Sequence, residues 1–287
     1  MIPMKEIVCI YRNGMPENSN DVDAWLIPVE GFSTRSSFEM NLRSIRDFKK
    51  KTSKKIYLLC DALLHQKDLE LLKSSFADWM ASGEMIFFQD LSIFMMAKQY
   101  GIEEKMVFYT PTLNVSFQDI CTLRESGIQN FILSKECAYQ DYKEILKCAD
   151  NLRLGMLALG FPQIYFSARK MISCFDEIYY LKLKEKKDLR IKEKTRTIRQ
   201  PIYEDERGTY IFAGEIFFPY RHLKEFFKDG MYFFIIDPVF IEDRYEDLPH
   251  LVSEAIETGT SDLSFFSQPV GDDFLFREMV DDYDKKD

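Results

Sequence analysis

Residues 55–88 have the sequence KIYLLCDALLHQKDLELLKSSFADWMASGEMIFF. Two short runs of apolar residues, Lys55–Cys60 and Met85–Phe88, are typical of buried strands. Between them, Asp68–Met80 has apolar residues at spacings of three and four, which predicts an amphipathic helix. A strand, a helix and a second strand in this order predict two parallel neighbours in one sheet.

The same alternation extends outward from this segment in both directions. Runs such as MIFF and YFFII are apolar almost throughout, as expected for strands that are buried on both faces. Eight such strands with helices between them predict an α/β fold, a (β/α)8 barrel of the TIM type. The eight expected strands are Lys5–Ile10, Ala24–Val29, Lys55–Cys60, Met85–Phe88, Lys105–Tyr109, Asn130–Leu133, Leu152–Leu159 and Tyr232–Ile236.

The spacing of the expected strands changes once, after the seventh. About seventy residues separate it from the eighth, far more than a short loop and helix require. We therefore expect seven βα units in residues 1–160, an inserted subdomain in 161–230, and the last strand, a helix and a C-terminal extension in 231–287.

The expected insertion contains a basic stretch, Lys182–Arg199, with nine Lys or Arg residues against three acids. It has two interpretations, a solvated surface segment or a contact with RNA phosphates or a protein partner. The candidate contact residues are Lys182, Lys184, Lys186, Lys187, Arg190 and Lys192.

Composition limits the classes of function. The 287 residues carry a net charge of −9, which argues against nucleic-acid binding over the whole surface. The start of the sequence has no signal-peptide pattern, and no apolar stretch has the length of a membrane span, so we expect a cytoplasmic protein without a membrane partner. The six cysteines show no metal-site spacing, and we expect reduced thiols and no bound metal.

Candidate site residues follow from the expected barrel, because the carboxyl ends of its strands form the functional face. No histidine triad, HExxH, Walker loop, GxSxG or GxGxxG pattern is present. Polar residues after strands also cap the following helices, so each has a structural interpretation too. The polar residues at these positions are Arg12, Asn13, Glu30, Asp61, Gln89, Asp90, Thr110, Thr112, Asn114, Lys135, Glu136, Ser167, Arg169 and Asp237.

Several stretches resemble a known family, the collagenase-like peptidases of family U32. PIYEDERGTYIF at 201–212 is similar to the stretch shared across that family, and YFSARKMIS at 165–173 to its tyrosine-serine-arginine motif. FFQDLSIF at 87–94 and GIQNFILSKECAYQDYKEI at 127–145 resemble its fourth strand and its sixth strand with the following helix. HLKEFFKDGMYFFIIDPVF at 222–240 and GDDFLFREMV at 271–280 resemble its later parts. The resemblance implies a barrel-like N-terminal region.

The resemblance also bears on cofactors. Family members that act in oxygen-independent hydroxylation hold an iron–sulfur cluster with four cysteines, one directly after the tyrosine-serine-arginine motif. Lys170 occupies that position here, and residues 175–200 contain no cysteine. We therefore expect no iron–sulfur cluster and no other cofactor. The chain looks most like the shorter of two paired members that support wobble-uridine hydroxylation in bacterial tRNA.

The leading hypothesis is a subunit without an iron–sulfur cluster that acts in forming 5-hydroxyuridine. The resemblance implies a cluster-bearing U32 paralogue as its partner, possible contact with tRNA, and a small metabolite at the barrel mouth. One alternative is a peptidase using Asp61, Glu136 and Asp237 as acid and base. The other is a non-catalytic scaffold or regulator, which would have a barrel mouth filled by ion pairs.

Residues are assigned to roles on this hypothesis. Arg169 and Ser167 come first as catalytic candidates, because they lie in the motif that matches the family and follow the expected seventh strand. Arg169 can hold a carboxylate or a phosphate through two hydrogen bonds. Glu136 is the third catalytic candidate. The substrate-binding candidates are Arg12, Asp61, Asn114, Glu204 and Asp237.

Overall fold

The strand, helix and strand expected at residues 55–88 are present in the computed structural model as β3 (Lys55–Cys60), α2 (Asp68–Ser82) and β4 (Met85–Phe88). The two strands pair in parallel, with Leu58 beside Ile86. The structure describes residues 5–149, 151–183, 186, 188–194, 198–242 and 244–276.

Eight parallel strands close into a barrel in the order β1-β13-β7-β6-β5-β4-β3-β2, which confirms the predicted fold class. Closure is made by β1, which pairs with β2 on one side and with β13 on the other. The remaining barrel strands are β1 (Glu6–Ile10), β2 (Ala24–Pro28), β5 (Met106–Tyr109), β6 (Asn130–Ile132), β7 (Arg153–Leu159) and β13 (Phe233–Ile236).

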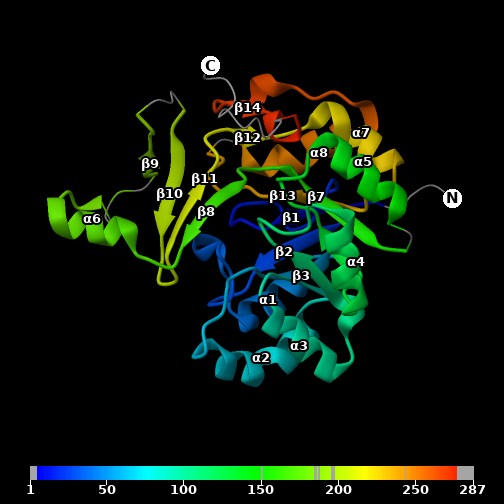
Figure 1. Ribbon diagram of the computed structural model, residues 1–287, viewed down its shortest axis with the longest axis horizontal. Coiled ribbons are helices and arrows are strands. Elements are labelled where there is room, and N and C mark those ends of the chain that lie inside the picture. Colours follow the sequence, from blue (N-terminus) through cyan, green and yellow to red (C-terminus); the bar gives the residue numbers. More distant parts are fainter. Residues whose placement is uncertain are drawn as a thin grey trace, which may run out of the picture.

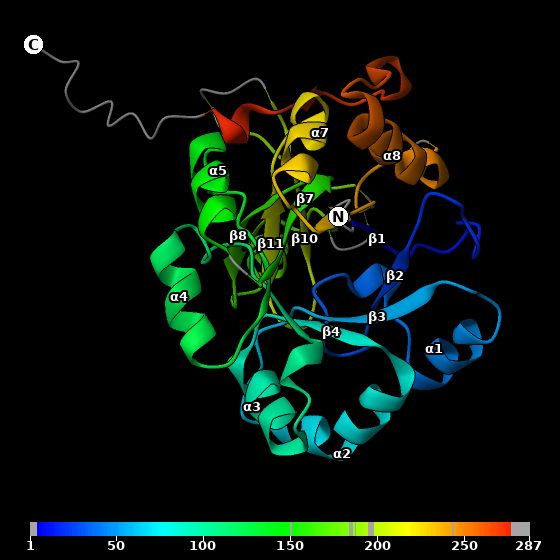
Figure 2. The same ribbon diagram turned by 90° about the vertical axis from the view of Figure 1, so that its right-hand side faces the viewer.

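Helices surround the strands on the outside of the barrel (Figure 2). Apolar side chains fill its inside, among them Leu59, Phe87 and Phe233, all fully buried. This two-sided burial explains the continuous apolar runs of the sequence. The other helices of this layer are α1 (Leu42–Lys49), α3 (Leu91–Tyr100), α4 (Phe117–Glu125), α5 (Tyr139–Cys148), α7 (Tyr220–Lys228) and α8 (Leu248–Thr258).

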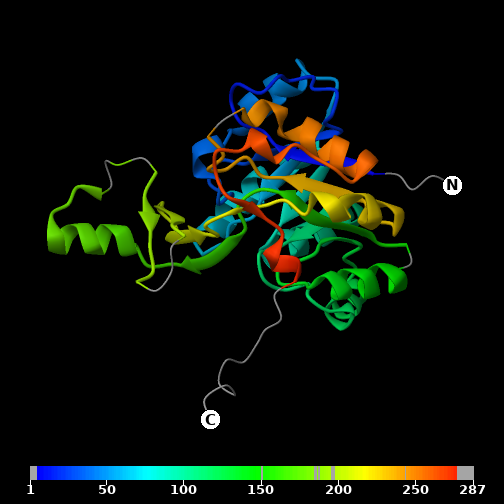
Figure 3. The ribbon, with the colours of Figure 1, turned by 90° about the horizontal axis from the view of Figure 1, so that it is seen from above.

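A second sheet stands between β7 and β13 in the chain and projects from the barrel (Figures 1 and 3). Its strands have the order β8-β11-β10-β9 and are antiparallel. They are β8 (Gln163–Ser167), β9 (Arg190–Ile191), β10 (Gln200–Glu204) and β11 (Thr209–Phe212), with α6 (Met171–Tyr179) between β8 and β9. We call residues 161–214 the insertion.

The two ends of the insertion meet at Gly160. Its N–H donates to the Phe217 carbonyl at 3.1 Å, and the Phe217 N–H donates back at 2.9 Å. Gly160 has a φ of 151°, and a Cβ here would lie 2.7 Å from the Asp237 carbonyl oxygen, so only glycine fits where the chain leaves the barrel.

After the insertion, β12 (Ile216–Phe217) pairs in parallel with β14 (Val270–Gly271). The chain then enters α7, which packs beside α8 in the outer layer. Within the described residues, no helix has both the length and the apolar character that crossing a membrane requires.

Candidate functional site

A buried arginine lies at the centre of the barrel mouth. Arg35, in the loop after β2, is only 6% exposed. Its Nη1 lies 2.7 Å from Asp61 Oδ2, directly after β3, and its Nη2 lies 2.8 Å from Asp237 Oδ2, directly after β13. A second donor, Nε, reaches the same Asp237 oxygen at 3.1 Å. One guanidinium thus joins the ends of strands on two sides of the barrel.

The remaining acceptor positions of the two carboxylates are also occupied. Asp61 accepts from Ser33 Oγ at 2.8 Å, from Thr34 N at 2.9 Å and from Thr34 Oγ1 at 2.6 Å. Asp237 Oδ1 accepts from the backbone N–H of Val239 at 3.1 Å. Burial opposes the charge of Arg35, but Asp237 and Asp61 outweigh it and raise the pKa of Arg35 above its ordinary value. We call this fixed, charged group of side chains the Arg35 cluster.

The insertion forms one wall of this mouth. The Tyr203 hydroxyl of β10 donates to the Thr34 carbonyl, and the Phe212 ring of β11 lies 5.8 Å from the Arg35 guanidinium. Tyr203 also stacks on Tyr210, with ring centroids 4.8 Å apart. The inserted sheet is therefore held against the Arg35 cluster by aromatic side chains.

The turn between β10 and β11 fastens the insertion to the barrel a second time. Arg207 donates to the carbonyls of Gly31 and Leu63 and lies 3.1 Å from Asp68 Oδ2. Beside this contact, burial raises the pKa of Glu39 to about 7, an effect that the backbone N–H groups of Gly31 and Ser33 reduce.

Three cavities lie around the Arg35 cluster. The smallest, about 40 Å³, is lined by Arg35, Asp61, Asp237 and Lys135. A second, about 410 Å³, lies between the barrel mouth and β8, and the largest, about 850 Å³, lies on the β10 side of the insertion. The scaffold hypothesis requires a mouth filled by ion pairs, and the ion pairs here leave the mouth unfilled.

Three residues expected at the mouth have structural contacts there. Arg12 lines the largest cavity, with Nη1 2.6 Å from the Ile241 carbonyl and its guanidinium 4.0 Å from the Tyr245 ring centroid. Asn114 is fully buried at a φ of 64°, and its Nδ2 donates to the Ile132 carbonyl at 3.2 Å. Glu136 points outward and lies 2.5 Å from Lys135 Nζ, with its own side chain 46% exposed.

Ser167 and Arg169 lie elsewhere than the sequence suggested. Both were expected after the seventh barrel strand, but the chain turns at Gly160 and Ser167 instead ends β8 of the inserted sheet. Arg169 is exposed, and its backbone N–H donates to Ser167 Oγ at 3.2 Å. The structure therefore does not bring these two residues together with Asp61 and Asp237.

Glu204 connects β10 to α6. Its carboxylate accepts from the Ser173 N–H at 3.1 Å, from the Ser173 hydroxyl and from Thr209 Oγ1 at 3.2 Å. Ser173 lies in the first turn of α6, where a carboxylate satisfies free N–H groups. These contacts position α6 on the inserted sheet.

Arg35 is the residue that sequence reasoning missed. It lies seven positions beyond the end of β2, in the polar run Ser33, Thr34, Arg35, and not directly after a strand. A charged residue flanked by two hydroxyl side chains in a loop of the functional face was the available signal, because such a group needs partners when it is buried.

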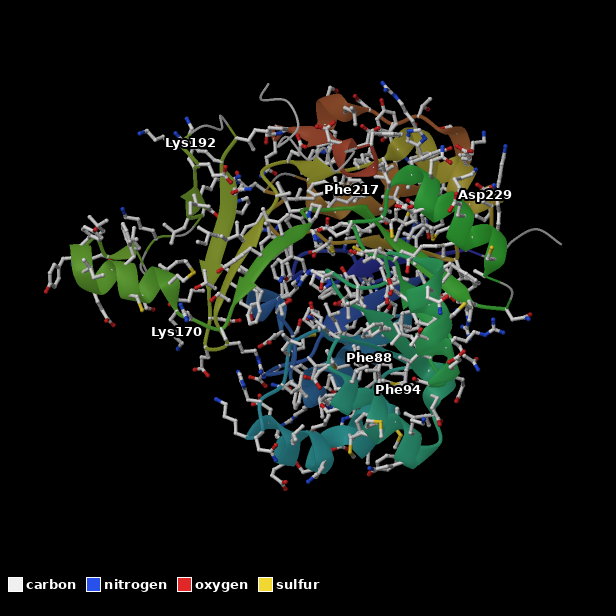
Figure 4. All side chains as sticks on the ribbon, viewed as in Figure 1. Phe88, Phe94, Lys170, Lys192, Phe217 and Asp229 are labelled. Atoms are coloured by element: carbon white, nitrogen blue, oxygen red, sulfur yellow. The ribbon has the colours of Figure 1, made fainter. Side chains whose placement is uncertain are left out.

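The described residues of the basic stretch lie on the outer part of the insertion. Lys182, Lys186 and Lys192 are exposed, whereas Arg190 lies 3.3 Å from Glu242. Figure 4 shows Lys170 and Lys192 on the inserted sheet and its loops, away from the barrel. The other two candidates, Lys184 and Lys187, lie outside the described residues.

The helix α6 exposes large apolar side chains beside these lysines. Phe175 and Tyr179 pack on each other at 4.4 Å, yet they are 47% and 57% exposed. Ile178 is 66% exposed, and only Ile172 and Ser173 of the helix are buried. A contiguous apolar surface of this kind marks an interaction site in soluble proteins. We call Phe175, Ile178, Tyr179, Tyr180 and Leu181 the α6 face.

The cysteines do not form a cluster site. Cys9 and Cys60 are buried in barrel strands, where burial raises the pKa of both thiols, and Cys174 is exposed on α6. Across the described ranges, no three His, Cys, Asp or Glu side chains are grouped as a metal ion would need. The donor set of a four-cysteine iron–sulfur centre is not assembled here.

Comparisons with known proteins place the chain in a family. The chain is 22% identical over 244 residues to "tRNA hydroxylation protein P2" of Bacillus subtilis (strain 168), with 82% of this chain and 79% of that protein covered. It is also similar to the solved structure of N-(5'-phosphoribosyl)anthranilate isomerase from Pyrococcus furiosus, with a TM-score of 0.43, 10% identity, and coverage of 88% of this chain and 98% of that chain. The model of peptidase family U32 matches residues 17–256, and the chain therefore belongs to peptidase family U32.

Proposed function

We propose that this protein is a subunit, itself without an iron–sulfur cluster, in the 5-hydroxylation of the wobble uridine of bacterial tRNA. The observation that carries the proposal is the match over 82% of the chain to a protein named for tRNA hydroxylation. In this proposal the protein acts in the cytoplasm, where it meets tRNA.

The exposed lysines of the insertion support a contact with RNA. Lys182, Lys186 and Lys192 lie on one projecting element of a chain whose overall charge is −9. Such a local excess of positive charge attracts phosphates, although the protein as a whole repels them. In the proposal, Arg169 adds a planar cation to the same projecting element.

The α6 face supports a contact with a protein partner. Exposing aliphatic side chains such as Ile178 and Leu181 to water is unfavourable, and these side chains contribute little to binding RNA. We assign the α6 face to a cluster-bearing U32 paralogue, which would supply the redox centre whose cysteines this chain lacks. The cavities at the barrel mouth are then available for the substrate base or for a small hydroxyl-donor metabolite.

The peptidase hypothesis obtains less support from the geometry. An acid and base pair needs one carboxyl group that can give up a proton and another that can take it. Asp61 and Asp237 instead share the same guanidinium, with Asp61 2.7 Å and Asp237 2.8 Å from it, and Glu136 points outward beside Lys135.

Mass spectrometry of nucleosides from total tRNA tests the proposal. A deletion strain is expected to lose 5-hydroxyuridine and its derivatives, and the wild-type gene to restore them. A variant with Lys182, Lys186 and Lys192 changed to Glu is expected to restore them poorly. The matched control changes three exposed lysines outside the insertion, Lys50, Lys51 and Lys73, to Glu.

Two results would contradict the proposal. One is an unchanged nucleoside profile in the deletion strain. The other is peptide hydrolysis by the purified protein that stops when Asp61 and Asp237 are changed to Asn, since this would establish the peptidase instead.

A further inference from the structure

We propose that the cavity of about 410 Å³ between the barrel mouth and β8 receives a single base extruded from the RNA strand, held by the amides of Gln89 and Gln163. The inference rests on the proposed function for the identity of the base, which is then uracil. We call this cavity the base pocket.

The base pocket has a suitable size and position. Its volume falls within the range of about 300–1,000 Å³ that is typical of small-molecule sites. Thr34, Asp61 and Gln89 of the barrel line one side, and residues 163–166 of β8 with Tyr210 of β11 line the other. A base that leaves its stack could enter between the barrel and the insertion, next to the Arg35 cluster.

The carboxylate and the guanidinium that line the base pocket, those of Asp61 and Arg207, are already paired. Asp61 is bound by Arg35 and by two hydroxyl groups, and Arg207 lies 3.1 Å from Asp68. A charged ligand would have to lose its hydration without gaining a free counter-ion from these groups. The lining therefore favours a neutral ligand with polar edges over a carboxylate or a phosphate.

Two amides in the base pocket have hydrogen-bonding capacity to spare. Within the described part of the chain, the side chains of Gln89, directly after β4, and Gln163, the first residue of β8, form no hydrogen bond. Each amide offers two donors and an acceptor. A uracil edge presents two carbonyl oxygens and the N3–H group between them, so one amide can donate to a carbonyl while its own oxygen accepts from N3–H.

Aromatic side chains supply the other half of base recognition. Tyr165, which is 44% exposed, lines the base pocket together with Phe166 and Tyr210, whose rings lie 5.0 Å apart. Base stacking on aromatic rings tolerates any base, whereas the amides read polar edges. The exposed lysines lie on the other side of the inserted sheet, where Lys186 lines the largest cavity, so they would meet RNA phosphates further along the strand than the extruded base.

Fluorescence anisotropy with two RNA stem–loops tests the base pocket. Both RNAs have the anticodon stem–loop sequence, one with uridine and one with an abasic ribose at the wobble position. The purified protein, alone and with the cluster-bearing paralogue, is expected to bind the uridine RNA roughly tenfold more tightly. The double variant Gln89→Ala, Gln163→Ala is expected to bind both RNAs with the affinity that the wild type has for the abasic one. Gln118→Ala, an exposed glutamine on α4, serves as the control and keeps the preference.

Each outcome decides the inference. A preference that disappears only in the double variant supports it. Equal affinities of the wild type for the two RNAs, absent binding of both, or an unchanged preference in the double variant would overturn it. The nucleoside profile of the deletion strain decides the proposed function separately, so the base pocket can fail while the function stands.

Discussion

The barrel has a buried charged cluster at each end, and the two clusters differ in what adjoins them. At the end formed by the strand amino termini, which we call the floor, Glu6 accepts from the hydroxyls of Tyr57 at 2.5 Å and Tyr232 at 2.9 Å and pairs with Lys55 at 2.5 Å. At the mouth, Arg35 joins two carboxylates and borders cavities on both sides.

The position of each cluster in the barrel predicts its role, which is stability at the floor and function at the mouth. The floor cluster closes the amino-terminal end of the strands, where polar residues of this fold serve stability, whereas the mouth lies at the carboxyl ends, where its sites are built. Both clusters satisfy buried charges, but only the mouth cluster keeps space beside it and contacts the insertion. Changes at the two ends are therefore expected to have different consequences.

The largest expected effect comes from removing the central cation of the mouth. Arg35→Met leaves Asp61 and Asp237 buried without their shared partner, and we expect it to lower the free energy of unfolding by about 4 kcal/mol. Urea titration measures the change. Arg46→Met is the matched control, because Arg46 pairs with Asp78 on the surface and should cost less than about 1 kcal/mol. Equal losses in the two variants would refute the assignment of Arg35 as the central ion.

At the floor, Glu6→Gln is expected to lower the free energy of unfolding by about 2 kcal/mol, because it removes the charged acceptor of the buried Tyr57 hydroxyl and the partly buried Tyr232 hydroxyl. Burial and the contact with Glu6 raise the pKa of Tyr57, so its hydroxyl remains a donor throughout the working pH range. Thermal unfolding checks the loss. If Arg35→Met at the mouth and Glu6→Gln at the floor lowered stability equally and changed RNA binding equally, the proposed difference between the two ends would be wrong.

A smaller effect, with a defined pH dependence, is expected at Glu39 beside the Arg207 contact. Burial raises the pKa of Glu39 in the folded protein from its ordinary 4.5 to about 7, so folding favours the protonated form. This contribution is complete below pH 4.5 and is lost as the pH rises through about 7. Glu39→Gln should therefore increase stability at pH 8 by about 1 kcal/mol, allowing for solvent screening, and by nothing at pH 4. Melting temperatures that differ equally at both pH values would contradict the assignment.

The smallest effect on stability is expected on the insertion. Ile178 of the α6 face is 66% exposed, so Ile178→Ser should change the free energy of unfolding by less than about 0.5 kcal/mol. Affinity for the paralogue should nevertheless fall roughly tenfold, measured by biolayer interferometry. Leu71→Ser, at an exposed leucine of α2, is the matched control and should leave that affinity unchanged. Equal affinities of both variants would exclude the α6 face as the docking surface.

The sequence predicted the barrel well because its strands are buried on both faces. The continuous apolar run at Met85–Phe88 reappears as β4 with the same bounds, and Lys55–Cys60 as β3. Positions directly after such strands could be assigned to the mouth, which is how Asp61, Gln89 and Asp237 were found.

The parts that could not be predicted depend on loops. Arg35 reaches the mouth through a loop whose path no local pattern specifies, since nothing in its spacing links it to Asp237, 202 positions away. Ser167 was placed on the wrong sheet because β8 follows β7 after a short connection, and the turn at Gly160 is visible only as one glycine. The exposure of the α6 face likewise depends on how far the insertion projects from the barrel.

One complementation experiment tests most directly whether the mouth carries the function and the floor carries stability. The deletion strain receives either the mouth variant, which is the double variant Gln89→Ala, Gln163→Ala, or the floor variant Glu6→Gln. Protein levels are matched by immunoblot, and tRNA nucleosides are measured by mass spectrometry. We predict that the floor variant restores 5-hydroxyuridine and that the mouth variant does not. Full restoration by the mouth variant, with loss in the floor variant at equal protein level, would contradict it.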